Sequence, residues 1–183
     1  MPHLRIYPAR KLPAYLKWQI VAFMRTYAWE VFRRKPIGWD FMQPETHPVS
    51  FALMEKRVLL SHALVTWRDL SHTGASYRTY GLSAVFTFPD VRGRGHGHQV
   101  VEAATAHILA SDADVAMLRC QPELKRFYGA AGWTPMDDLK ILYGSKENPT
   151  EGDRIMMLFV SAKGPLAQAA FRQDPVYVGD YMW

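Results

Sequence analysis

The chain has 183 residues, of which 49% are hydrophobic and 21% charged, and its formal net charge is +5. This composition is ordinary for a globular protein, and the length allows one well-buried domain over residues 1–183 but is short for two. A single cysteine, Cys120, excludes an intramolecular disulfide. No apolar run approaches the roughly 20 residues of a membrane span, and the start Met1–Arg5 lacks the apolar core of a signal segment. We therefore expect a soluble, cytoplasmic protein with no membrane partner.

The positive charge is concentrated near the N-terminus. Residues 1–35 hold eight Lys/Arg and one Glu, whereas residues 36–183 hold fourteen Lys/Arg and sixteen acidic residues. Such a segment suits either a nucleic-acid surface or a helix with a solvated basic face. We favour the solvated face and expect no nucleic-acid partner, because the chain has no Ser/Arg-Gly repeat and no recognition-helix motif.

The first elements are predicted from periodicity and proline. Residues 4–7 are a short strand candidate closed by Pro8, and Pro13 suits the first turn of a helix. An apolar stripe at helical spacing follows: Leu16, Ile20, Met24, Tyr27 and Val31. Aromatic residues and Met24 on this helix are expected in the core: Trp18, Phe23, Tyr27 and Trp29. Three prolines predict a loop over residues 36–49.

Strands dominate the middle of the chain. Residues 51–54 and 58–67 are strand-like and are joined by the charged turn 55–57, which predicts an antiparallel hairpin. A polar turn around Gly74 then leads into a long strand candidate over residues 77–88, rich in aromatic and β-branched residues.

The second half alternates between helix and strand. It contains a helical face from Val100 to Ile108, a strand over 115–120 and a helix that begins at Pro122 and ends at Gly132. Two closing strands are predicted over 139–143 and 154–160, around a polar loop. Without a repeat or a linker, this order predicts one mixed α/β unit.

A glycine-rich turn joins strand 77–88 to the next helix. Glycines stand at positions 93, 95 and 97, where backbone amides can crowd around a ligand without Cβ clashes. With Arg92, Arg94 and the helix N-terminus, they form an anion site suited to a phosphate. The spacing G-x-G-x-G differs from the dinucleotide fingerprint, and the Gly-Lys-Ser/Thr of NTPase loops does not occur. A tight turn that binds no ligand is the alternative.

Two blocks carry a family resemblance. The pattern Arg-x-x-Gly-x-Gly, at Arg92, Gly95 and Gly97, resembles the pyrophosphate loop of the GNAT superfamily of acyl-CoA-dependent N-acetyltransferases. Tyr128, followed by Gly132 and Trp133, is similar to a strand–helix unit of the same superfamily. The resemblance implies the GNAT fold, an α/β (α+β) domain with a mixed central sheet of about six or seven strands flanked by helices. It also implies acetyl-CoA as cosubstrate.

The resemblance further implies where acetyl-CoA binds, namely between parallel strands 77–88 and 115–120. Backbone groups near the end of strand 77–88 would pair with the pantetheine arm, and amides of the glycine-rich turn would hold the pyrophosphate. Gln121 stands near a position where relatives often carry asparagine. The implied cofactor-binding residues are Val85, Phe86, Thr87, Arg92, Gly93, Arg94, Gly95, His96, Gly97 and Gln121.

The same resemblance assigns the catalytic residue. Tyr128 is expected to protonate the CoA thiolate as the tetrahedral intermediate collapses, and a packed helix tyrosine is the alternative. Many relatives carry a glutamate base on strand 77–88, but this strand has no carboxylate. Deprotonation then falls either to water, which Ser83 or Tyr80 would position, or to a group from another segment. The missing carboxylate supports an alternative function, a catalytically idle acyl-CoA-binding module of the GNAT fold.

The acceptor is the least specified part of the reaction. The chain is similar to aminoglycoside 2′-N-acetyltransferases in four features: its length, the ending Gly179–Trp183, the spacing of Trp39 and His47, and the Gly132–Pro135 block. This implies acceptor binding by Ser83, Asp180 and Trp183. We expect a primary amine of a small molecule, with an aminoglycoside as one candidate, and a homodimer as one form of the protein.

Other reactive side chains receive structural interpretations. His96 and His98 diverge by about 200° at a helix start, so we predict exposed or phosphate-contacting histidines and no metal site. Cys120 is predicted to be a buried core cysteine.

Overall fold

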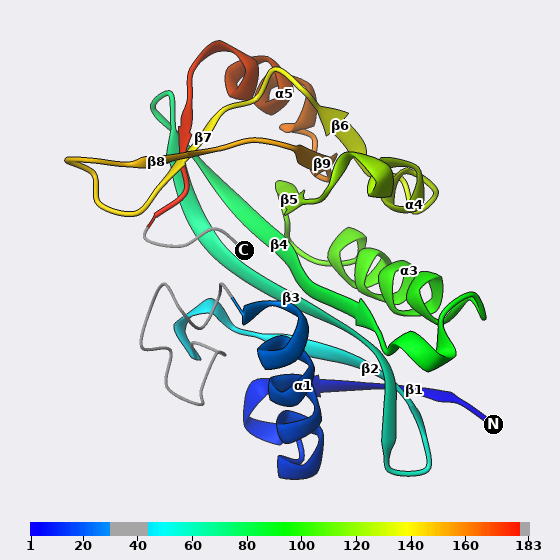
Figure 1. Ribbon diagram of the computed structural model, residues 1–183. Helices are drawn as coiled ribbons and strands as arrows, with labels where there is room; N and C mark the ends of the chain where they lie inside the picture. Colours follow the sequence, from blue (N-terminus) through cyan, green and yellow to red (C-terminus); the bar gives the residue numbers. More distant parts are fainter. Residues whose placement is uncertain (30–43, 180–183) are drawn as a thin grey trace. The chain divides into compact units, whose positions relative to one another are not determined.

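The computed structural model describes residues 1–29 and 44–179 (Figure 1). The strands are β1 (His3–Pro8), β2 (Val49–Glu55), β3 (Val58–His72), β4 (Ala75–Thr87), β5 (Val115–Arg119), β6 (Thr134–Met136), β7 (Ile141–Tyr143), β8 (Thr150–Gly152), β9 (Ile155–Phe159) and β10 (Val176–Tyr177). The helices are α1 (Ala14–Tyr27), α3 (His96–Leu109), α4 (Lys125–Gly129) and α5 (Gly164–Gln173), with short 3-10 turns η1 (Ala9–Lys11), η2 (Pro44–Thr46), η3 (Pro89–Val91) and η4 (Pro122–Leu124). No helix within these described ranges is long and apolar enough to cross a membrane.

Seven strands form one mixed sheet in the order β1-β2-β3-β4-β5-β9-β6. β4 and β5 are parallel, with Thr79 opposite Val115 and Gly81 opposite Met117. The β1–β2, β2–β3, β5–β9 and β6–β9 pairs are antiparallel. A second sheet has the order β10-β7-β8. The seven-stranded mixed sheet with its helices confirms the predicted fold class.

The chain forms two compact units, each built from two separate segments. Unit 1 comprises residues 1–66 and 84–104, and unit 2 comprises residues 67–83 and the chain from residue 105 onward. β3, β4 and α3 contribute residues to both units. The assignment of residues 1–183 to a single domain stays a prediction.

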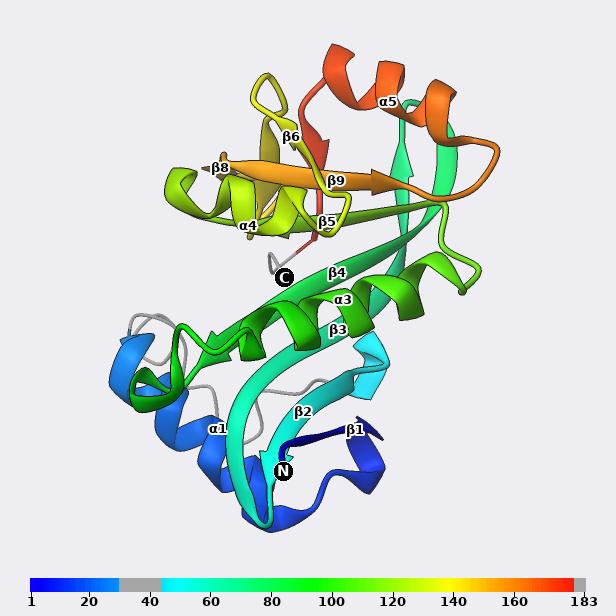
Figure 2. The same ribbon diagram turned by 90° about the vertical axis from the view of Figure 1, so that its right-hand side faces the viewer.

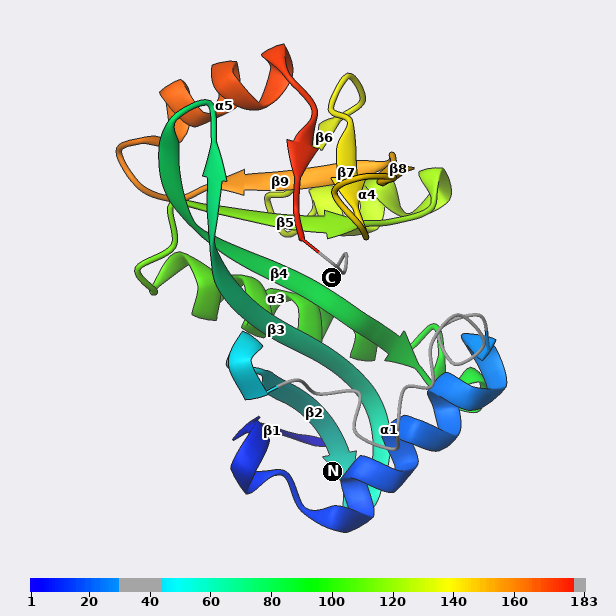
Figure 3. The ribbon, with the colours of Figure 1, turned by 90° about the vertical axis from the view of Figure 1, so that its left-hand side faces the viewer.

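The core of unit 1 lies between α1 and the strands β2 and β3 (Figure 3). α1 follows Pro13 as predicted, and Leu16, Ile20 and Phe23 are buried at positions i, i+4 and i+7. The Phe23 ring stacks on Phe86, with centroids 3.9 Å apart. Further buried members of this core are Ala52, Met54, Leu59 and Leu64.

The predicted aromatic core of α1 is wrong for three of its residues. Trp18, Tyr27 and Trp29 are 51%, 57% and 50% exposed. Trp18 lies two residues from the buried Leu16, which turns it about 200° around the helix axis, away from the core. Tyr27 is the last residue of the helix and Trp29 follows its end. Val31 lies outside the described residues.

Unit 2 has a separate core beneath α5. Buried residues come from β4, β5, β7, β9, β10 and α5: Tyr77, Val115, Met117, Ile141, Ile155, Met157, Ala167, Phe171 and Val176. Strand β9 lies between β5 and β6, as Figure 2 shows. Helix α5 presents Ala167 and Phe171 to this core at a spacing of four residues.

The two predicted closing strands are present but do not pair with each other. Both strands exist, as β7 and β9, but β9 pairs with β5 and β6, while β7 pairs with β8 and β10. β6, β8 and β10 were not predicted, because strands of two or three residues are too short to show an alternating pattern. α5 was not predicted either, since its buried face holds few large apolar residues.

Candidate active site

The glycine-rich turn lies in unit 1, between the end of β4 and the start of α3. Gly93 and Gly95 have φ angles of +76° and +78°, a conformation that favours glycine. A Cβ atom built on either residue would meet nothing within 4 Å. The glycines are therefore required for their backbone conformation, and open space lies over them.

Local bonds hold this turn at the helix N-terminus. The Arg92 side chain donates from Nε to the Thr87 carbonyl at 3.0 Å, and the Gln99 amide donates to the Gly95 carbonyl at 3.2 Å. Gly95 thus accepts the first bond of α3, whose first amides have no partner within the helix. Arg92 and Arg94 are exposed. One short segment combines cations with the positive end of a helix, as predicted for an anion site.

Of the two predicted alternatives, exposed or phosphate-contacting, His96 is not the exposed one. It is only 8% exposed, and its Nδ1 has no hydrogen-bond partner among the described residues, whereas His98 is exposed. A buried nitrogen without a partner costs about 1–3 kcal/mol. A phosphate group at the start of α3 would offer it an acceptor, so this residue fits a pyrophosphate-bearing cosubstrate.

The end of β4 carries the residues assigned to the pantetheine arm. Phe86 is buried in the unit 1 core, and Val85 and Thr87 are half-buried. The Phe86 carbonyl accepts from Ser61 Oγ at 2.7 Å, and the Thr87 carbonyl accepts from Arg92. Each carbonyl has a second lone pair. Pairing with a pantetheine amide through Phe86 or Thr87 therefore depends on that second lone pair.

In unit 2, the Tyr128 block is a helix end. Tyr128 lies on α4, and Gly132 has a φ of +92°. The Trp133 amide donates to the Tyr128 carbonyl at 3.3 Å, and the Gly132 amide donates to the Gly129 carbonyl at 3.0 Å. These two bonds form a Schellman motif. The spacing Tyr-x-x-x-Gly-Trp therefore corresponds to the helix end, and it places Tyr128 in the last turn of α4.

Trp133 anchors this helix end in unit 2. It is 2% exposed, and its indole N–H donates to Thr105 Oγ1 on α3 at 2.9 Å. The buried indole thus has the partner that a buried tryptophan needs.

The Tyr128 hydroxyl has a buried and weakly polar environment. Burial raises the pKa of Tyr128, and the nearby Cys120 raises it further. No hydrogen bond of this hydroxyl is made to another described residue. Burial likewise raises the pKa of Cys120, whose Sγ lies 3.6 Å from Met156 Sδ. Cys120 is thus a protonated core thiol, as predicted.

Some of the remaining predicted positions lie outside the described residues. Gln121 is exposed, and its side-chain carbonyl accepts from the Arg154 guanidinium. Ser83 is half-buried, and the Tyr80 hydroxyl donates to Asp112 Oδ1 at 3.0 Å. His47 is exposed. Trp39, Asp180 and Trp183 lie outside the described residues.

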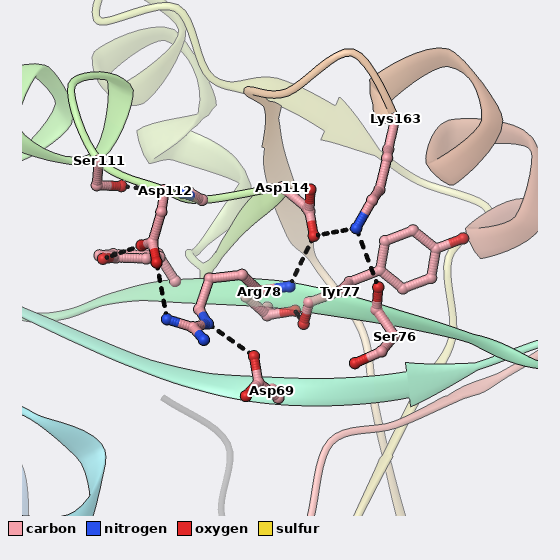
Figure 4. A network of polar contacts seen from close by, with 11 residues as sticks. Asp69, Ser76, Tyr77, Arg78, Ser111, Asp112, Asp114 and Lys163 are labelled. Carbon is pink, nitrogen blue, oxygen red and sulfur yellow. Dashed lines mark hydrogen bonds and ion pairs between the residues drawn. The ribbon is translucent and has the colours of Figure 1, made fainter.

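A polar network in unit 2 was not predicted (Figure 4). The Arg78 side chain donates to Asp69 at 2.7 Å and to Asp112 at 2.8 Å, and its guanidinium lies 4.0 Å from the centroid of the Trp67 ring. Asp114, at the start of β5, is nearly buried and accepts from the Arg78 amide at 2.9 Å. The sequence signal was the pair of aspartates just before a buried strand.

Asp114 also binds the segment after β9. Its carboxylate accepts from Ser161 Oγ at 2.7 Å and from Lys163 Nζ at 3.0 Å. Burial alone would raise the pKa of Asp114. The hydrogen bonds and the Lys163 charge outweigh burial and hold that pKa below its usual value. The network is structural in character, since it links β4, β5 and the segment that enters α5.

Comparison with known proteins agrees with this fold. No family model matches the chain, and no curated protein matches it. An acyl-CoA N-acyltransferase from Pseudomonas aeruginosa shares 18% identity over 86% of this chain and 99% of its own, with a TM-score of 0.58. A GCN5-related N-acetyltransferase from Ralstonia eutropha shares 14% identity over 74% of this chain and 94% of its own, also at 0.58.

A third structure is a probable N-acyltransferase from Enterococcus faecalis, with 15% identity and a TM-score of 0.54. The match covers 75% of this chain but 33% of that protein, so this chain spans about a third of its length. At such low identities the likeness concerns the fold. The chain has the acyl-CoA N-acyltransferase fold that its two sequence blocks indicated.

Proposed function

We propose that this protein is an acetyl-CoA-dependent N-acetyltransferase that acts on a primary amine of a small molecule. The observation that carries the proposal is the glycine-rich turn. Left-handed Gly93 and Gly95 and the start of α3 fit a pyrophosphate within this fold, as does the buried His96, whose Nδ1 bonds to no described residue. In a turn that binds no ligand, the buried His96 Nδ1 would stay without a described partner at a cost in free energy, whereas a bound phosphate would give it an acceptor.

The residues divide into binding and catalytic roles. Amides and side chains from Arg92 to Gly97 hold the pyrophosphate, and the backbone of Val85–Thr87 orients the pantetheine arm. Bound acetyl-CoA supplies the activated thioester. The acceptor amine attacks the carbonyl carbon, the C–S bond breaks, and the Tyr128 phenol donates its proton to the leaving sulfur. The nitrogen loses its proton to water, since β4 carries no carboxylate, and the Tyr128 phenolate regains a proton from water.

The acceptor class follows from the family resemblance. We propose a small primary amine, with Ser83, Asp180 and Trp183 as acceptor-binding residues and an aminoglycoside as one candidate. Support comes from the family resemblance alone. We further propose a cytoplasmic protein with one domain over residues 1–183 and no nucleic-acid partner.

One experiment tests the proposal directly. Acetyl-CoA binding is measured by calorimetry, and release of CoA thiol is then followed with aminoglycosides, polyamines and peptides as acceptors. We expect binding, and thiol release with at least one amine. Binding without release by any amine would favour the idle acyl-CoA-binding module, and absence of binding would contradict both functions.

Arg94 offers a variant test of the pyrophosphate site. Its guanidinium is exposed and, within the described part of the chain, makes only a 3.5 Å contact with the Asp90 carbonyl, so its removal is expected to leave the turn intact. Arg94→Ala is expected to raise the Kd for acetyl-CoA about threefold to tenfold, because an exposed charge-assisted contact is lost. Arg10→Ala, an exposed arginine on η1, serves as the control. Equal effects of the two variants would point to general charge and not to the turn.

A further inference from the structure

One residue inside β4 has a strained backbone. Ala84 has a φ of +46°, and among the described residues it is the only non-glycine residue within a strand that adopts the left-handed conformation. This conformation costs a residue with a Cβ atom free energy and persists only where surrounding structure enforces it. It bends the strand directly before Val85–Thr87, the segment assigned to the pantetheine arm. We refer to this feature as the Ala84 bend.

A buried histidine on the neighbouring strand holds the bend. His62 on β3 is fully buried, and its Nδ1 lies 2.9 Å from the Ala84 carbonyl. Since a carbonyl only accepts, Nδ1 carries the proton, and Nε2 accepts from the buried Ser50 hydroxyl at 3.2 Å. Burial lowers the pKa of His62 to about 4, so the ring is neutral near pH 7 and keeps this tautomer. Both ring nitrogens are thereby engaged.

The Phe86 carbonyl, two residues after Ala84, is also bound by a side chain of β3. Ser61, beside His62, donates to the Phe86 carbonyl at 2.7 Å and contacts Thr87 Oγ1 at 2.9 Å. The Phe86 ring also lies close to the His62 ring, with centroids 5.3 Å apart. Two adjacent side chains of β3 therefore fix the carbonyls on either side of Val85.

We infer that His62 is a positioning residue for acetyl-CoA, which holds the Ala84 bend and so orients the Val85–Thr87 backbone toward the pantetheine arm. The inference rests on the proposed function. His62 is fully buried, and its ring bonds to Ser50 on β2 and to Ala84 on β4, so it is assigned no contact with a reacting atom. Its effect reaches the cosubstrate through the backbone of β4.

A double-mutant cycle tests this coupling. His62→Phe keeps a buried ring but removes both hydrogen bonds, and Ala84→Gly removes the strain at the bend. His62→Phe is expected to raise the Kd for acetyl-CoA about tenfold with Ala84 present, because, of the two lost bonds, the one to the Ala84 carbonyl holds the bend, and its net contribution is that of one hydrogen bond. In the Ala84→Gly background, the increase is expected to be about threefold or less, because glycine adopts the bend without support. His62→Gln, which retains an N–H donor, should bind within about threefold of the wild type.

His72→Phe is the matched control. His72 is also a buried histidine of β3, and its Nε2 lies 3.0 Å from the Ala170 carbonyl in unit 2. Its replacement is expected to lower the Tm while leaving the Kd for acetyl-CoA unchanged. An equal rise in Kd for both histidine variants, or equal effects of His62→Phe with and without Ala84→Gly, would overturn the inference. The Tm values of the variants without ligand measure the His62–Ala84 coupling independently of acetyl-CoA binding. Failure of the wild type to bind acetyl-CoA would overturn the proposed function and, with it, the positioning role.

Discussion

Replacing Tyr128 with phenylalanine is expected to lower the turnover of acetyl transfer about a hundredfold, while the Kd for acetyl-CoA stays within about threefold. The thiolate that leaves the tetrahedral intermediate needs a proton donor. Burial raises the pKa of Tyr128, so the phenol remains protonated throughout the neutral range. Stopped-flow or steady-state measurement of thiol release gives the turnover, and calorimetry gives the Kd.

Stability separates a catalytic Tyr128 from a packed one. Its hydroxyl bonds to no other residue that the structure describes, so its removal should change the free energy of unfolding by less than about 0.5 kcal/mol. Tyr77→Phe makes the same change at another buried tyrosine of unit 2 and should leave turnover unaltered. A Tyr128→Phe enzyme with wild-type turnover would show that the tyrosine only packs.

Ionisation of Tyr128 sets a second expectation for the same enzyme. Because the pKa lies above the ordinary value near 10, the rate should show no loss due to this phenol below about pH 10. A descending limb between pH 8 and 9 that disappears in Tyr128→Phe would mean that the phenol titrates there, contrary to its buried environment.

Sequence reasoning succeeded where one local pattern determines one element. Strands β1 to β5 and helices α1, α3 and α4 follow periodicity, proline and turn signals. The glycine-rich turn was predictable because its left-handed backbone favours glycine at positions 93 and 95, and this spacing of glycines is visible in the sequence. The Tyr128 block was predictable for a similar reason, since a Schellman helix end needs glycine at one position.

The sequence did not predict the features that tertiary contacts determine. The pairing of β9 with β5 and β6 depends on which buried face each strand meets, and the strand's own sequence does not record that choice. Trp18 was assigned to the core by composition, but its angle around α1 turns it outward. His62 is an ordinary strand residue in the sequence, and only the fold brings it to the Ala84 carbonyl.

The polar network around Asp114 shows the same limit, and it yields the largest expected loss of stability. Asp114→Ala is expected to lower the free energy of unfolding by about 3 kcal/mol, because the Arg78 amide, the Ser161 hydroxyl and the Lys163 ammonium lose their common acceptor. Asp112→Ala is the control from the same network. Its side chain is 64% exposed, so its ion pair with Arg78 and its bond from the Tyr80 hydroxyl should together contribute less than about 1 kcal/mol. Urea unfolding at pH 7 measures both.

The pH dependence identifies the charge of Asp114 as the cause. Its pKa is lowered in the folded state, so the unfolded chain binds the proton more readily. The stabilisation is therefore fully present above the unfolded pKa of about 3.9 and is lost as the pH falls through the lower folded pKa. Asp114→Asn keeps the shape without the charge, and its deficit relative to the wild type should shrink as the pH is lowered from 7 to 3. A deficit that stays constant over this range would assign the stability to shape and neutral hydrogen bonds. Equal losses for Asp114→Ala and Asp112→Ala would show that burial of the carboxylate does not distinguish the two.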